Sequence, residues 1–330
     1  MKLLKRIMVF FMFGLTFFYI YPYAIVFVHI GKNFPSYLFY SIKQARLFNK
    51  SCDIYLLINR KVNTASLNEK FKYYSVNIVE LESIAKTREH IAFLKETTLN
   101  KISMGGFWLY TSERFLYLND FAKQFEIVDM IHLESDNMIY VDFEELIAIF
   151  QQYYPGLGLV LDNDVRCIPG IVFFADSDST EKVAQCFLHY ASSGKNDMQV
   201  LAKYYQEKKE ANVADTLPII MPAYIEYFGL SSRAGHKTTD PARYCNHIED
   251  FKSIFDGAAL GQYLGGIDPR NGHSKPGFIN ESCLFNPSKL KIVWERDTEG
   301  RKVPFAIFNE ACYRINNLHI HSKKLNQFSS

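Results

Sequence analysis

Short apolar runs alternate with segments of helical periodicity along most of this chain. The runs are rich in β-branched and aromatic residues, and they predict strands at residues 24–30, 53–59, 75–80, 130–133 and 158–161. Between the first two strands, residues 37–48 carry apolar side chains at helical spacing, so that strand, helix and strand form a βαβ unit. The pattern therefore predicts an α/β, Rossmann-like fold with a mixed, mostly parallel sheet flanked by helices.

The segments after the first βαβ unit follow other patterns. A further helix is predicted over residues 107–123, where Arg114 occupies a polar gap in an otherwise aromatic pattern. Residues 179–210 have a helical, charged pattern, whereas residues 231–275 have the Gly, Asp, Asn, His and Pro content of functional loops. Since no internal repeat is present, we predict one folded domain over residues 23–330.

The start of the chain has the pattern of a membrane-insertion signal. Lys2, Lys5 and Arg6 precede an apolar and aromatic run from residue 7 to about residue 21. A cleaved secretory signal, an uncleaved signal anchor and a buried strand or helix are the alternatives. The lack of a small-x-small cleavage site and the aromatic cluster at the end of the run favour the anchor. The run is shorter than the usual span of about 20 residues, which predicts a short or shallow anchor.

The basic residues before the apolar run also predict an orientation. The positive-inside rule keeps the N-terminus cytoplasmic and sends the folded domain across the membrane. We therefore expect a single-pass type II membrane protein, with residues 1–22 as cytoplasmic tail and signal anchor. The folded part would face the Golgi or endoplasmic reticulum lumen in a eukaryotic or viral setting, and a bacterial protein would sit at the inner membrane.

Composition narrows the function classes. The formal net charge is +2, from 37 Lys and Arg against 35 Asp and Glu, and the basic residues are spread along the chain, so no nucleic-acid partner is expected. The chain lacks G-x-G-x-x-G and G-x-x-x-x-G-K-[ST], so dinucleotide-binding and P-loop chemistry lose support. The six cysteines form no C-x-x-C pair, which argues against a zinc cage and leaves disulfides open.

A pair of carboxylates follows the predicted strand at residues 130–133. Glu134 and Asp136 stand at i and i+2 at the strand end, so their side chains project to the same side. Such a pair can hold one hard divalent cation, and the cation can neutralise a diphosphate. The alternative is an acidic turn that caps the next helix, which we would prefer for an isolated E-x-D. The neighbouring segments favour the metal site.

Together with these segments, the E-x-D resembles the signature of the GT-A fold family of nucleotide-sugar glycosyltransferases, a D-x-D or E-x-D at the end of a central strand. The opening βαβ unit looks like the part of such enzymes that holds the donor nucleobase, which implies His29 and Asn59 as donor contacts. The resemblance also implies a donor-binding role for Arg114 on the predicted helix. Ile168-Pro-Gly170 is similar to the glycine-bearing strand that contacts the donor sugar, and Asn196-Asp-Met-Gln199 resembles the D-Q segment of retaining members, which implies Asp197.

Near the C-terminus, Asn317-Leu-His-Ile-His-Ser-Lys323 resembles the family's closing segment. There a histidine completes the metal shell, and a lysine holds the diphosphate, so Lys323 is implied both as a donor contact and as the group that stabilises the leaving diphosphate. Either His319 or His321 could be the ligand, and we favour His321 because Lys323 lies close behind it. The resulting O, O, N ligand set favours manganese, with magnesium as the alternative.

The glycine-rich segment at residues 255–271 offers a further catalytic candidate. Asp256 and Asp268 could bind sugar hydroxyls or serve as a base that deprotonates the acceptor, and if the reaction inverts the sugar, Asp256 is the candidate base. If the reaction retains the configuration, the resemblance requires no separate base, and the leaving phosphate takes the acceptor proton. A tightly turned loop with capping aspartates is the structural alternative. Asp162 and Asp164, just after a strand, compete for the same role, although a simple β-turn accounts for them.

The sequence thus predicts a metal-dependent glycosyltransferase of the hexosyltransferase kind that uses a UDP- or GDP-sugar and a glycan, protein or lipid acceptor. Its domain would have a nucleotide-binding half to about residue 164 and an acceptor half after it. Glu134 in place of Asp, Pro169 in place of Asn, and a closing segment without Gly and Pro-Trp leave donor and stereochemistry open. The alternatives are a catalytically inactive glycosyltransferase-like protein that binds nucleotide or glycan, and a nucleotidyltransferase, for which residues 31–35 are a weak phosphate loop.

Overall fold

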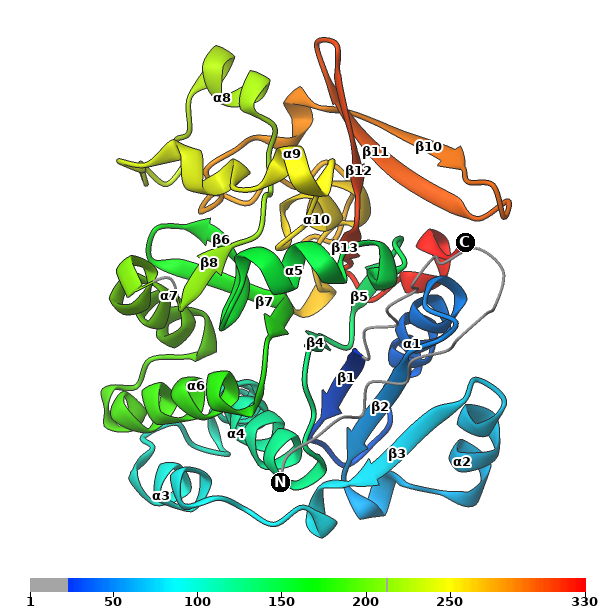
Figure 1. Cartoon of the computed structure of the whole chain (residues 1–330), viewed down its shortest axis with the longest axis vertical. Helices are drawn as coiled ribbons and strands as arrows, with labels where there is room; N and C mark the ends of the chain where they lie inside the picture. The colour runs from blue at the N-terminus through cyan, green and yellow to red at the C-terminus, as the bar shows by residue number, and fades with distance from the viewer. Residues whose placement is uncertain (1–22, 212) are drawn as a thin grey trace, which may run out of the picture.

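A seven-stranded sheet forms the centre of the molecule in the computed structural model, which describes residues 23–211 and 213–330 (Figure 1). In spatial order, its strands are β3 (Val76–Glu80), β2 (Asp53–Ile58), β1 (Ala24–His29), β4 (Met130–Leu133), β7 (Arg166–Phe174), β6 (Leu157–Asn163) and β8 (Ala214–Thr216). All neighbours pair in parallel except that β7 is antiparallel to both β4 and β6. The predicted mixed, mostly parallel sheet is therefore confirmed.

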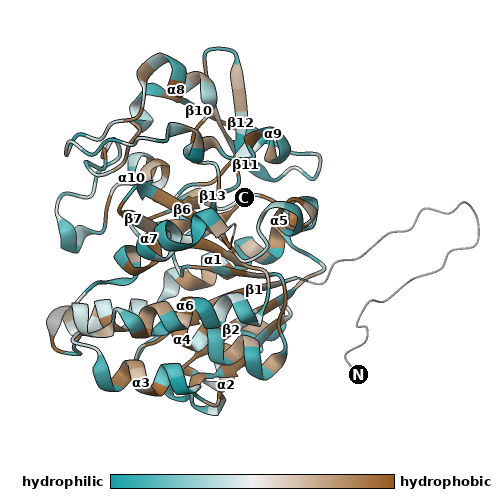
Figure 2. Ribbon diagram, turned by 60° about the vertical axis from the view of Figure 1, so that its left-hand side comes forward, coloured by the Kyte–Doolittle hydropathy of each residue, from teal (hydrophilic) through white to brown (hydrophobic). Residues whose placement is uncertain are grey.

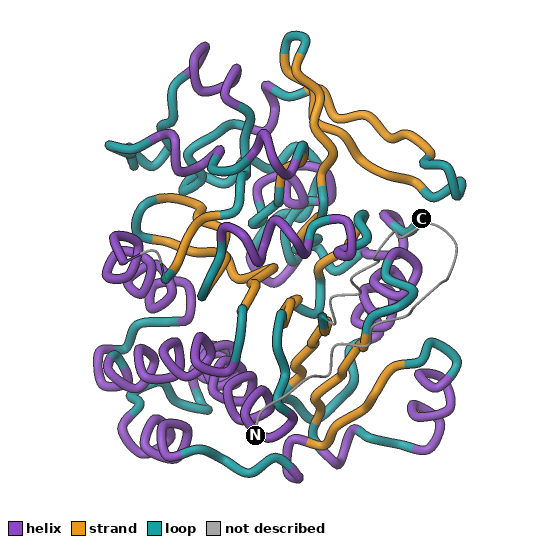
Figure 3. The backbone as a smooth tube through the Cα atoms, viewed as in Figure 1, coloured by secondary structure: helices purple, strands orange, loops and turns teal. Residues whose placement is uncertain are grey.

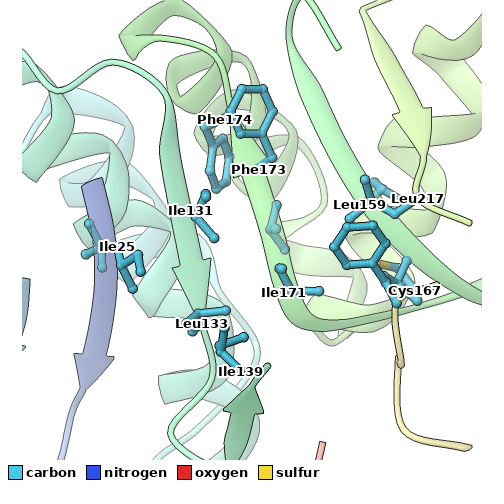
Figure 4. Close-up of a cluster of buried hydrophobic side chains, with 14 of the residues drawn as sticks. Ile25, Ile131, Leu133, Ile139, Leu159, Cys167, Ile171, Phe173, Phe174 and Leu217 are labelled. Carbon is cyan, nitrogen blue, oxygen red and sulfur yellow. The ribbon is translucent and has the colours of Figure 1, made fainter. Parts of the chain in front are cut away.

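The apolar runs of the sequence become strands that are buried on both faces. Figure 4 shows Ile25 of β1, Ile131 of β4 and Phe173 of β7 side by side in the core, and all are fully buried. Ile131 pairs with Phe173, and Leu133 at the end of β4 pairs with Ile171. Near-continuous apolar strands of this kind require cover on both sheet faces. Figure 2 shows hydrophobic residues concentrated along the central strands and hydrophilic residues on the outer sides of the helices.

The helices around the sheet agree with the predicted ones and add to them. They are α1 (Ser36–Phe48), α2 (Ala65–Lys72), α3 (Arg88–Glu96), α4 (Phe107–Phe125), α5 (Ile147–Tyr153), α6 (Ser177–His189), α7 (Asp197–Lys208), α8 (Pro222–Phe228), α9 (Ile248–Phe251) and α10 (Ala259–Gly265). The helical pattern of residues 179–210 is divided between α6 and α7, because Gly194 takes a φ of 70° and Asn196 starts a new helix with a capping box.

A second sheet, which the sequence did not predict, lies beyond the central one in Figures 1 and 3. It has four strands in the order β10 (Lys291–Arg296), β11 (Lys302–Phe308), β12 (Ala311–Ile315) and β9 (Ser253–Ile254). The turn between β10 and β11 returns to α1, where Arg301 lies 4.2 Å from the ring centroid of Phe48 and donates to the Leu47 carbonyl at 3.2 Å.

A short two-stranded ladder connects the last part of the chain to the centre. β13 (Asn317–His319) pairs antiparallel with β5 (Asn137–Ile139), and His319 is opposite Asn137. Because β5 follows β4 directly, this pairing brings the C-terminal segment next to the end of a central strand. The predicted signal anchor, residues 1–22, lies outside the described residues. Over the part of the chain that the structure does describe, no helix is long and apolar enough to cross a membrane.

Candidate metal and donor-binding site

The E-x-D motif lies at the carboxyl end of β4, in the middle of the central sheet. The Glu134 amide donates to the Gly170 carbonyl at 2.9 Å, and the Asn137 amide donates to the Glu134 carbonyl at 3.1 Å, so the motif forms a tight turn between β4 and β5. One ligand atom each from Glu134, Asp136 and His319 lie within 4.8 Å of one another. The two carboxylates predicted to face one side therefore do so, and a histidine from β13 joins them.

The hydrogen bonds of His319 prepare its outer nitrogen for a cation. Nδ1 lies 2.7 Å from the Gly257 carbonyl, so the hydrogen-bond network assigns the ring proton to Nδ1. Nε2 then faces Glu134 at 3.4 Å and Asp136 at 3.2 Å. Metal-binding histidines commonly donate the other ring N–H to a carbonyl in this way. The oxygen, oxygen, nitrogen set thus fits a divalent cation of the manganese or magnesium kind.

The structure corrects the preference for His321 as the histidine ligand. After His319 the chain turns, with the His321 amide donating to the His319 carbonyl at 3.0 Å, so the two rings do not share one side of a strand. Their centroids are 6.3 Å apart, and Nδ1 of His321 accepts from the Asp268 amide at 3.0 Å. His321 therefore lies beside the ligand set and not within it. The nearness of Lys323 in sequence was not a sufficient guide, because the strand ends at His319 and the chain turns before His321.

Arg114 connects two candidates that are far apart in the sequence. It extends from α4, forms an ion pair with Glu134, and places Nη2 2.7 Å from Oδ2 of Asp197, the first residue of α7. All three side chains are at least largely buried. Burial alone would raise the pKa of Glu134, but Arg114 and then His319 hold it below its usual range. Burial also raises the pKa of Asp197, and Arg114 opposes that rise.

Lys323 completes the charge arrangement on the opposite side of the motif. Its ammonium group forms an ion pair with Asp136. Burial would raise the pKa of Asp136, but Lys323 and His319 hold it well below its usual range. A cation bound to Asp136 would replace Lys323 as the positive charge that stabilises the Asp136 carboxylate. The ammonium group would then be available to an anionic ligand.

Glycines permit the close packing around His319. A Cβ atom on Gly170 would lie 3.1 Å from both Nδ1 of His319 and Nδ2 of Asn137. A Cβ atom on Gly261 of α10 would lie 2.1 Å from the His319 carbonyl oxygen, which is a direct clash. Gly170, expected to contact the donor sugar, thus lies at the ligand set. Gly261 lets α10 pack directly on β13.

Sequence reasoning missed two asparagines that hold this packing together. Asn137 donates to the Gly170 carbonyl at 2.5 Å and accepts from Asn317 at 3.0 Å. Asn317 also donates to the Asp256 carbonyl at 2.8 Å. Both asparagines are fully buried; Asn137 directly follows the E-x-D, and Asn317 is the first residue of the closing segment. Their positions at the motifs were the available sequence signal for a structural role, because a buried side-chain amide needs specific hydrogen-bond partners.

Asp256 lies under this site, but its carboxylate is fully engaged. It accepts from the amides of Leu260 at 2.9 Å, Gly261 at 2.8 Å and His319 at 3.0 Å. Burial raises its pKa to about 6, against the effect of these amides. The side chain is thus a cap for α10 and an anchor for the His319 backbone. This geometry does not support the expectation that Asp256 is a base.

His29 is the last residue of β1 and Asn59 follows β2, and the carboxyl ends of these strands lie at the same sheet edge as Glu134 because β1, β2 and β4 are parallel. Nε2 of His29 lies 2.8 Å from the Asn33 carbonyl, and Asn59 accepts from the Gly31 amide at 2.9 Å. Asn59 also donates to Glu82 at 3.1 Å. The two residues are therefore placed on the edge that carries the ligand set, and each shapes the loop after its strand.

No protein-family model matches the chain, and no curated protein matches it. Among solved structures, apo mouse xyloside xylosyltransferase 1 is similar at 9% identity over 63% of this chain and 91% of that one, with a TM-score of 0.43. An active-site mutant of LgtC matches at 12% identity over 67% of this chain and 81% of that one, with a TM-score of 0.43. A cytidylyltransferase from Leptospira borgpetersenii matches at 8% identity over 60% and 76%, with a TM-score of 0.36.

The ion pairs of Arg114 predict a large stability effect. Arg114→Met strands Glu134 and Asp197 as buried charges, so we expect a loss of about 3–5 kcal/mol in the free energy of unfolding, measured by urea denaturation. Arg114→Met combined with Asp197→Asn should recover part of that loss, because one stranded charge is removed. Lys182→Met, which breaks an exposed pair with Asp178, should change the value by less than about 1 kcal/mol. Equal effects of Arg114→Met and Lys182→Met would contradict this prediction.

Proposed function

We propose that this protein is a metal-dependent glycosyltransferase that moves a sugar from a UDP- or GDP-sugar to a glycan, protein or lipid acceptor. The observation that carries the proposal is the buried convergence of Glu134, Asp136 and His319 at the carboxyl edge of the central sheet, flanked by Arg114 and Lys323. Ligands of open α/β sheets bind at this edge. The GT-A resemblance of the motifs is consistent with it.

Each part of the proposed chemistry has a candidate side chain in this site. A divalent cation, manganese before magnesium, polarises the diphosphate when it is bound. Lys323 stabilises the charge that develops on the leaving diphosphate. Arg114 holds Glu134 and Asp197 in place, and Asp197 keeps one carboxylate oxygen without a partner among the described residues. Such an oxygen suits a hydroxyl of the donor sugar, whereas His29 and Asn59 belong to the nucleobase end.

The engagement of Asp256 favours the route that needs no separate base. Its carboxylate oxygens already accept three backbone amides, so it is poorly placed to take the acceptor proton. In the retaining route, the acceptor oxygen forms its bond to the anomeric carbon as the bond from that carbon to the diphosphate breaks. The acceptor proton passes to the leaving phosphate oxygen. We therefore favour retention of configuration, which the anomeric NMR signal of the product would decide.

Asp136 provides the sharpest test of the proposed reaction. Nucleoside diphosphate release should be measured with the full chain against a panel of UDP- and GDP-sugars, with and without manganese. We expect release from one donor only when manganese is present, and a fall of about 100-fold or more in Asp136→Asn because a ligand of the cation is lost. Asp178→Asn, at an exposed carboxylate on α6, is the matched control and should retain activity.

The remaining results of this experiment separate the alternatives. Nucleotide binding without release from any donor, with candidate acceptors present, would favour the glycosyltransferase-like binding protein. Metal-dependent activity that survives in Asp136→Asn would overturn the assignment of the ligand set. A product that carries a nucleotidyl group would identify the nucleotidyltransferase alternative.

The pKa of His319 predicts how manganese affinity depends on pH. Burial lowers this pKa, but Asp136 and then Glu134 raise it to about 9 in the metal-free protein. A cation must displace that proton, so the affinity should rise with pH, by up to about tenfold per unit, until it levels off near pH 9. Manganese binding followed by electron paramagnetic resonance between about pH 6.5 and 8.5 measures this slope. His319→Gln should flatten it, and an unchanged slope in that variant would contradict the prediction.

The proposal includes a type II membrane topology through residues 1–22, with the domain in the Golgi or endoplasmic reticulum lumen or, for a bacterial protein, at the inner membrane. The basic residues and the apolar run support it, and Tyr23 leads directly into β1. Carbonate extraction of membranes from cells that express the full chain should leave it in the pellet. A chain that starts at Tyr23 should be released, and equal release of both would contradict the anchor.

A further inference from the structure

A second cationic side chain stands beside the site, on the loop that follows α10. Arg270 holds the Asp268 carboxylate in a fork, with Nε 3.1 Å from each oxygen and Nη2 2.6 Å from Oδ2. The Arg270 amide also donates to Oδ1 of Asp268 at 2.9 Å. This geometry orients the guanidinium group, and Nη1 has no hydrogen-bond partner among the described residues.

Asp268 connects this fork to the ligand set. Its amide donates to Nδ1 of His321, two residues after His319. Asp268 is buried with an exposed side-chain fraction of 8%, whereas Arg270 is exposed at 80%. The contacts from His321 to Asp268 and from Asp268 to Arg270 therefore connect the buried motif to the solvent-exposed surface. The guanidinium group lies at the rim of the site.

Tyr37 on α1 shows that Arg270 and Lys323 approach the same place. Nζ of Lys323 lies 5.5 Å from the ring centroid of Tyr37. Burial raises the pKa of Tyr37, and both Lys323 and Arg270 are close enough to oppose that rise. Asp136 and Asp268 act on the same phenol. Lys323 therefore lies beside α1, and Arg270 is within electrostatic reach of the same phenol.

The charges of the proposed donor explain why a second cation would be useful there. The diphosphate of a nucleotide-sugar carries two negative charges, and Glu134 and Asp136 already offset those of a divalent cation. Lys323 supplies one further positive charge, and Arg270, whose charge is paired with Asp268, would add N–H donors to the phosphate oxygens. Arginine presents a planar fork that matches phosphate oxygens, and an exposed ion pair alone stabilises a fold little. Ligand binding therefore explains why Asp268 orients Arg270 better than a contribution to fold stability does.

We propose that Arg270 is a ligand of the donor diphosphate, oriented by Asp268 and acting beside Lys323. The inference rests on the proposed function, because it takes a nucleoside diphosphate group as the ligand. It adds a phosphate contact from the loop after α10 to the contacts implied by the motifs. Arg270 is exposed, so its replacement tests binding without disturbing the core.

The test compares nucleoside diphosphates with the matching nucleosides. Calorimetry with manganese present would measure the dissociation constants of UDP, GDP, uridine and guanosine for the full chain. Arg270→Ala should weaken the diphosphate that binds by about tenfold and leave its nucleoside unchanged, because a charge-assisted contact to phosphate is lost. Arg270→Lys should recover part of the affinity. Arg88→Ala, at an exposed arginine on α3, is the matched control and should match the wild type.

The outcomes distinguish this inference from the proposed function. If the wild type binds UDP or GDP and Arg270→Ala binds it equally well, the inference is wrong and the function stands. An equal loss of nucleoside and diphosphate would also overturn it, because it would indicate a structural role. If the wild type binds no nucleoside diphosphate, the proposed function fails, and the inference fails with it. A loss confined to the diphosphate, with partial recovery by lysine, would support it.

Discussion

The buried ion pairs of Arg114 are the interaction on which the site depends. Glu134, Asp136 and Asp197 bring three carboxylates into one largely buried region, and their mutual repulsion would oppose folding. Arg114 forms ion pairs with both Glu134 and Asp197, and Lys323 forms one with Asp136. The fold can therefore hold an acidic cluster ready for a cation without leaving unpaired charges in the interior. Because Arg114 lies on α4 and Asp197 starts α7, this charge balance also sets the positions of both helices.

The second constraint is the close packing of the C-terminal segment on the end of β4. β13 reaches the motif by pairing with β5, and α10 covers it at a distance that only Gly261 permits. Asp256 and Asn317 tie the backbone of this layer together. The ligand set is thus assembled from the two halves of the chain, so the geometry around His319 depends on contacts between segments more than 100 residues apart. With the proposed contact from Arg270, the diphosphate would also be bound by residues from both parts of the chain.

Several elements were predictable because their signal is local. The central strands are continuous apolar runs, and the E-x-D follows one of them, so its place at the sheet edge was foreseeable. The second sheet was not, because β10 is mostly exposed and has only three consecutive apolar residues between charged ones, a pattern that a loop would also allow. The sequence suggested a base at Asp256 from residue type alone. Only the tertiary structure places three backbone amides on its oxygens.

By itself, the sequence determined the α/β class and the position of the carboxylate pair, because these follow from periodicity and short spacings. The resemblance of the motifs implied a histidine for the metal and a lysine for the diphosphate. Tertiary structure alone decided that His319 and not His321 joins the carboxylates, since a turn after β13 changes which ring faces them. It also decided that Arg114 links Glu134 to Asp197. These pairings join segments far apart in the chain. The physical reason is that a buried charge needs a partner close to it in space, and no local pattern in the sequence encodes which residue that is.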